Sequence, residues 1–85
     1  MRSAAIAVGT TAVLVIAADD TLRTVYVHHE SDNAIYLGGD NVSTTNGLHL
    51  KKGSTRDIVV PSRQTIYAIS DTAAQEVRIL TPDID

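Results

Sequence analysis

The side chains that could perform chemistry in this 85-residue chain begin with a run of two histidines and an acid. His28, His29 and Glu30 are consecutive, and His49 is a third imidazole further along the chain. Adjacent residues of a strand point to opposite faces of a sheet, so His28 and His29 cannot readily bind one metal ion. We therefore interpret them as solvated histidines at the end of a strand, and we predict no metal site.

A second candidate is the loop from Gly38 to Gly47, which is rich in Gly, Asn, Ser and Thr. A phosphate-binding loop needs a Gly-Lys-Ser/Thr ending before a helix, whereas here the last glycine precedes Leu48 in a strand-like run. An EF-hand loop starting at Asp32 or Asp40 lacks the required oxygen ligands and the closing glutamate. We expect a structural role instead, in which Gly38-Gly39 and Asn46-Gly47 at the two ends of the loop supply positive φ at tight turns.

Nucleophilic catalysis finds no support in the sequence. The chain has no cysteine, and no serine stands in a G-x-S-x-G motif. Its acids are scattered singly across turn-like segments, where carboxylates commonly bond to nearby backbone. A ligand pocket usually needs roughly 300 Å³ or more, and so small a chain has little room for one. We predict that the protein is not an enzyme, with no catalytic residue and no cofactor.

The composition predicts an all-β fold. Val, Ile and Thr make up 27 of the 85 residues, and β-branched side chains suit pleated strands better than helices. Short strand-like runs separated by turn signals at even spacing predict a small single-domain antiparallel β-sandwich or β-barrel of about seven or eight strands, covering residues 1–85. The predicted strands are Ala4–Val8, Ala12–Ala17, Leu22–His29, Ala34–Leu37, Leu48–Leu50, Arg56–Val60, Thr65–Ser70 and Glu76–Leu80.

The apolar start of the chain has two interpretations. Its basic beginning and small residues near Ala17 are typical of a secretory signal peptide. However, Gly9-Thr10-Thr11 interrupts the apolar run with turn chemistry, which favours two strands. The run is also too short and too broken to span a bilayer. A further interpretation makes residues 1–20 an arm or an intersubunit element.

Size and charge indicate which partners to expect. The net charge is −3 and no basic cluster exceeds Lys51-Lys52, so we predict no binding to nucleic acid. A domain of this size without disulfides is marginally stable alone, and a partner chain is a common remedy. The strand Ala12–Ala17 is apolar on both faces, whereas a monomeric antiparallel sheet usually solvates one face. We therefore predict a second buried surface, formed between subunits.

The segment "SDNAIYLGGDNVSTTNGLHLKKGSTRDIVVPSRQTIYAISDTAAQEVRIL", from Ser31 to Leu80, resembles small structural proteins of tailed bacteriophages. The resemblance rests on the ordered elements "IYLGG", "NG", "VP", "YAIS" and "VRIL". The sequence departs from that pattern at His49, where some relatives have a proline, and at Ser62, where a glycine is common. Both departures affect the local geometry of turns.

The resemblance implies a capsid decoration (cement) protein that binds the major capsid protein on the outer surface of the virion and is made in the host cytoplasm. It also implies a homo-oligomer, commonly a trimer, in which the Gly38–Gly47 loop seats on a neighbouring subunit or shapes an exposed tip. Two alternatives remain open at this point: a tail or fibre module that binds a receptor or glycan, and a host protein with an immunoglobulin-like sandwich. An exposed platform built from the three tyrosines would favour the fibre module. The residues predicted to lie at an interface are Val13, Leu14, Val15, Ile16, Tyr36, Asn41, Val42 and Leu48.

Overall fold

The computed structural model describes residues 1–82, and in them the chain forms eight strands and no helix. The strands are β1 (Arg2–Val8), β2 (Val13–Ile16), β3 (Arg23–His29), β4 (Ile35–Gly38), β5 (Leu48–Leu50), β6 (Thr55–Val60), β7 (Ile66–Ser70) and β8 (Gln75–Thr81). The predicted all-β fold is confirmed, and each predicted strand occurs with its ends shifted by at most two residues. The apolar N-terminal run forms the two strands β1 and β2, as expected from the turn at Gly9-Thr10-Thr11.

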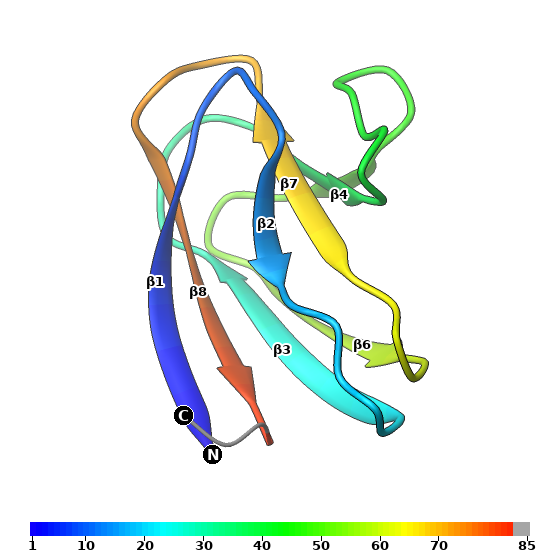
Figure 1. Cartoon of the computed structure of the whole chain (residues 1–85). Coiled ribbons are helices and arrows are strands. Elements are labelled where there is room, and N and C mark those ends of the chain that lie inside the picture. The colour runs from blue at the N-terminus through cyan, green and yellow to red at the C-terminus, as the bar shows by residue number, and fades with distance from the viewer. Residues whose placement is uncertain (83–85) are drawn as a thin grey trace.

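The strands pair into two four-stranded antiparallel sheets that pack face to face (Figure 1). Sheet A has the order β1-β8-β3-β6, and sheet B has the order β2-β7-β4-β5. Every connection passes from one sheet to the other except the one between β4 and β5, which pair as neighbours. This order is that of an eight-stranded jelly roll, in which two Greek keys fold across each other. The sandwich predicted from sequence is therefore found in this specific topology.

The core lies between the sheets and is built almost entirely from aliphatic side chains. Alternate residues of each strand point inward, so that β3 contributes Val25 and Val27 while β4 contributes Ile35 and Leu37. No aromatic ring occurs among the buried apolar residues of the described chain, and the three tyrosines lie on the outer faces. The aromatic rings of the three tyrosines therefore belong to the outer surfaces of the sandwich and not to its core.

Strand β2 departs from the alternation that the sequence predicts. The register with β7 shifts between Leu14 and Ile16, which marks a β-bulge at Val15. Because of the bulge, Val15 and Ile16 are both buried, whereas Leu14 is 41% exposed. Val13 is partly buried against the core. The strict alternation expected for this strand therefore ends at Ile16, and three of the four residues of β2 contact the core while Leu14 faces outward.

Candidate functional site

The outer face of sheet B carries an apolar and aromatic patch, which we call the tyrosine face. It consists of Leu14 on β2, Tyr67 and Ile69 on β7, Tyr36 on β4 and His49 on β5. Cross-strand pairing places these side chains together, because Leu14 lies opposite Tyr67, and Tyr36 lies between Ile69 and His49. The rings of Tyr36 and His49 are 5.3 Å apart and tilted by 31°. None of the five residues carries a full charge when His49 is neutral.

The Gly38–Gly47 loop is packed against the rim of this face by Val42. The Val42 side chain is only 6% exposed. A Cβ added to Gly38 would lie 2.8 Å from Val42 Cγ2, and one added to Gly47 would lie 2.5 Å from Tyr36 Cβ. Hydrogen bonds within the loop fix its shape, since the Gly47 N–H donates to Ser43 O at 3.0 Å. The loop is therefore an ordered part of the domain, tied to β4.

The predicted role of the loop glycines was wrong in its mechanism. Gly38, Gly39 and Gly47 do not adopt positive φ, and the only glycine of the described residues that does so is Gly53. The two ends of the loop need glycine because Val42 and Tyr36 leave no room for a Cβ. Close packing, which sequence alone does not show, replaces the expected turn geometry.

The residues predicted to lie at an interface divide into two groups. Val15, Ile16 and Val42 are buried within the domain, and Val13 packs partly buried against the core. The remainder face solvent to differing degrees: Leu14, Asn41 and Leu48 are exposed, and Tyr36 is half-buried. The tyrosine face brings Leu14 and Tyr36 together, with Asn41 in the adjoining loop. That they contact a partner stays a prediction.

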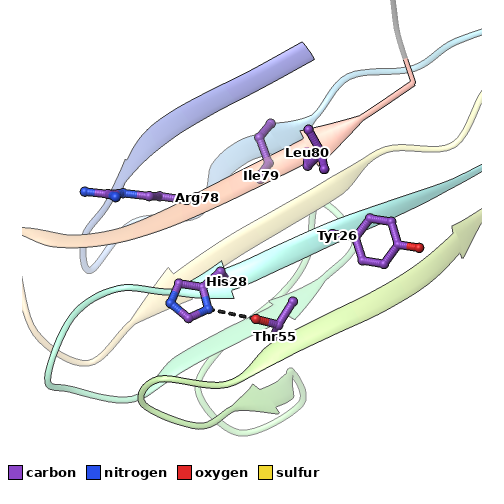
Figure 2. Close-up of a pocket in the computed structure, with 6 residues that line it drawn as sticks. All are labelled: Tyr26, His28, Thr55, Arg78, Ile79 and Leu80. Atoms are coloured by element: carbon purple, nitrogen blue, oxygen red, sulfur yellow. Dashed lines mark hydrogen bonds between the residues drawn. The ribbon is translucent and has the colours of Figure 1, made fainter. Parts of the chain in front are cut away.

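The outer face of sheet A has a different character. A shallow, open depression of about 220 Å³ lies there, lined by Tyr26 and His28 of β3, Thr55 of β6, and Arg78, Ile79 and Leu80 of β8 (Figure 2). The register explains this grouping, because His28 pairs with both Thr55 and Arg78, and Tyr26 pairs with Leu80. The depression thus combines an exposed aromatic ring with a hydroxyl, an imidazole and a guanidinium group.

A polar network runs along one end of the depression. His28 Nδ1 lies 2.8 Å from the Thr55 hydroxyl oxygen, and its Nε2 lies 3.2 Å from a Glu30 carboxylate oxygen. Arg78 approaches Glu30 at 4.0 Å and Glu76 at 3.8 Å. A hydroxyl, an imidazole and a carboxylate in sequence can relay a proton. Acyl transfer also needs oxyanion donors and exclusion of water, and this depression is open to solvent.

His29 differs from its neighbour and corrects the sequence interpretation. It is 1% exposed, so the two histidines are not both solvated. Its Nδ1 accepts a hydrogen bond from the Ser31 N–H at 3.1 Å, and its Nε2 lies 2.6 Å from Asn33 O. Since Nδ1 is an acceptor, Nε2 carries the proton and donates to that carbonyl. His29 is a structural residue that ties down the turn between β3 and β4.

The depression and its network were missed from sequence because they depend on strand pairing. Thr55 and His28 are distant along the chain and meet only through the register of β3 with β6. The rule that neighbouring strand residues face opposite ways did separate His28 from His29, as predicted. In residues 1–82 no group of three or more His, Asp or Glu side chains is placed to hold a metal ion.

Comparison with known proteins gives no relatives for this chain. No protein-family model, no curated protein and no solved structure matches it. The described residues contain no helix long and apolar enough to cross a membrane.

Proposed function

We propose that the chain is a structural protein of a tailed-bacteriophage particle, a decoration protein that binds the outer capsid surface and stabilises the shell. Its main partner in this proposal is the major capsid protein, and it acts as a homo-oligomer. It works through shape and surface chemistry, and binding to the assembled shell in turn stabilises its own marginally stable fold by mass action.

The observation that carries the proposal is where the recurring sequence elements meet in the fold. "IYLGG" forms β4 and the start of the loop, and "YAIS" lies in β7. These strands are hydrogen-bonded neighbours in sheet B. Tyr36 from the first element and Tyr67 from the second both lie on the tyrosine face, and the "NG" element ends the loop beside Tyr36. Elements far apart in sequence therefore gather on one uncharged outer surface.

The topology supports the same reading by analogy. Jelly rolls serve as capsid and lectin domains in many proteins, although a fold alone never determines a function. An uncharged face of Tyr, Leu and Ile side chains is suited to burial against another protein, where tyrosine is enriched and charged groups are depleted. We assign this face to the capsid surface.

The test uses particles purified from the phage that encodes the chain. Co-sedimentation with capsids stripped of the protein should recover binding with the wild-type chain, in a copy number stoichiometric with the major capsid protein. Tyr67→Glu should lose binding, because it places an unpaired charge in the contact. Val59→Glu is the matched control, since Val59 is 59% exposed on β6 of the other sheet. Absence from the particle, or equal binding by both variants that fold, would contradict the proposal.

The depression on sheet A favours a second candidate function, a tail or fibre module that binds a glycan. Tyr26 is 44% exposed there, beside Arg78, His28 and Thr55. An aromatic ring with nearby hydrogen-bonding groups suits the apolar and hydroxyl faces of a sugar. The three tyrosines do not form one platform, because Tyr26 lies on the opposite outer face from Tyr36 and Tyr67. A few copies per virion, with saccharide-induced NMR shifts at Tyr26 that Tyr26→Ala abolishes, would support this alternative.

A further inference from the structure

The two sheets have four edge strands, and three of them are protected against pairing with another chain. β5 has three residues, and β2 has four and contains a bulge. β6 carries the exposed charged residues Arg56 and Asp57. Short length, bulges and charges are the devices by which proteins prevent edge-to-edge association.

The fourth edge strand, β1, is neither short nor bulged, and its one charged residue, Arg2, stands at its first position. It is seven residues long, and its register with β8 is continuous from Arg2–Thr81 to Val8–Gln75. From Ser3 to Val8 it has no charged residue, no proline and no glycine. Among the described residues it is hydrogen-bonded to β8 alone of the strands. Its other edge lies at the left of the molecule in Figure 1 and is a long pairing template that carries no charge from Ser3 to Val8.

The core is also incompletely covered beside this edge. Four apolar residues pack against the core while remaining partly exposed, and three of them lie on β1 and β2: Ala4, Ile6 and Val13. β1 and β2 are the edge strands on the same side of the sandwich and are in contact with each other. The most exposed apolar side chain of β2, Leu14, is on this side as well. Another polypeptide seated along β1 would cover this margin.

We propose that the occupant is a second copy of this chain, paired antiparallel through β1 about a two-fold axis at Ala5. This register joins the two A sheets into one eight-stranded sheet. It places Ala5 opposite Ala5 of the second copy, Ser3 opposite Ala7, and Ala4 opposite Ile6. The outward residues Ser3, Ala5 and Ala7 are small, so no side chain obstructs the approach. No like charges oppose each other, because Arg2 would face Val8.

A two-fold contact is favoured over the trimer implied by the phage resemblance. Antiparallel pairing of one strand with itself is isologous and closes at two copies. A trimer formed through β1 would need β1 to pair with a different edge strand, and the other three are short, bulged or charged. This inference concerns the isolated chain and does not depend on capsid binding.

The test uses charge reversal at the axis, followed by analytical ultracentrifugation over a range of concentrations. The wild-type chain should sediment as a dimer of the 9.1 kDa protomer. Ala5→Lys and Ala5→Glu should each raise the dissociation constant at least about tenfold, because opposed residues of antiparallel strands have Cβ atoms about 5 Å apart. An equimolar mixture of the two variants should recover the dimer, since the opposite charges then face each other.

Val59→Lys is the control, because it adds a charge to the outer face of sheet A away from β1. It should leave the dimer unchanged, and thermal unfolding should show that every variant is folded. Arg78 lies beside Ala5 on β8, so the Lys and Glu variants are compared for folding first. A monomeric wild-type chain, a trimer, or no recovery on mixing would overturn the proposal. Because no capsid is present, such a failure is separate from any failure in the capsid-binding test.

Discussion

Gly47→Ala should destabilise the domain even though its backbone conformation is open to alanine. The added Cβ would lie 2.5 Å from Tyr36 Cβ, 2.9 Å from Val42 Cγ2 and 3.1 Å from Ser43 O. Real Cβ atoms do not approach other heavy atoms as closely as the first two distances, and Tyr36 Cβ belongs to β4 and cannot rotate away. The loop must therefore move off the strand.

Two effects of opposite sign set the size of the change. Replacing glycine by alanine reduces the entropy of the unfolded chain and stabilises by about 0.4–1 kcal/mol where the site accepts a Cβ. Forcing extra atoms into a packed site costs about 1–3 kcal/mol. The steric cost is the larger over almost all of these ranges, so we expect a net loss of up to about 2.6 kcal/mol. For a domain of this size each kcal/mol shifts Tm by about 4–8 °C, so the change is readily measured.

The assay is equilibrium unfolding in urea together with a thermal scan, for Gly47→Ala and two comparison variants. Gly9→Ala is the matched control, because a Cβ at Gly9 meets nothing within 4 Å and its φ is not positive, so this variant should be more stable than the wild type. Gly38→Ala should be destabilised, and should be partly rescued by Val42→Ala, since its clash is with the Val42 side chain. If Gly47→Ala is as stable as Gly9→Ala, the loop is not packed on β4 and the reasoning fails.

Three other predictions follow from the buried and charged groups. Val15→Asp should abolish folding, because it buries an unpaired charge, whereas Leu14→Asp should leave a cooperative thermal transition. Circular dichroism distinguishes the two variants, and equal stability of both would contradict the bulge. His29→Leu should lower the free energy of unfolding by about 1–3 kcal/mol for each of the two backbone groups left without a hydrogen-bond partner. Urea unfolding measures this loss, and an unchanged stability would exclude the structural role of His29. A hydrogen bond from the Lys52 ammonium, at 2.9 Å, lowers the pKa of Asp32. Because that pKa is lower in the folded state, the Asp32–Lys52 pair stabilises the folded state above the ordinary pKa of 3.8, and this contribution is lost as the pH falls through the folded pKa. Lys52→Met should raise the Asp32 pKa in an NMR titration. An unchanged pKa would show that the pair does not form in solution.

The strands could be predicted from the sequence because their signals are local. β-branched runs bounded by Gly, Asn, Asp and Ser mark each strand to within two residues, from β1 to β8. The order of the strands in the sheets could not be predicted in the same way. It depends on pairings such as β1 with β8, which join the two ends of the described chain.

The candidate surfaces were predictable only in part. Tyr36 was singled out from sequence and lies on the tyrosine face, but its neighbours Tyr67 and His49 join it through strand pairing. The bulge at Val15 interrupts the expected alternation and buries Ile16, and no residue type in that apolar run predicts it. Val42 was expected in an exposed loop, but its side chain is buried, because Gly38 and Gly47 have no Cβ and leave space for it. Nothing in the local sequence indicates this packing role of the two glycines.

The pairing of β1 with β8 has a consequence for how the protein is made. Of the eight described strands β1 is synthesised first, and the strand it pairs with, β8, is completed last. At about 5–20 residues per second, the ribosome takes roughly 3–13 s to reach β8 after β1 has formed. Through that interval the nascent chain carries β1, uncharged from Ser3 to Val8, without the strand that pairs with it. Several nascent chains on one messenger RNA would then hold such strands near each other, so a chaperone that shields the first residues should raise the yield of folded protein.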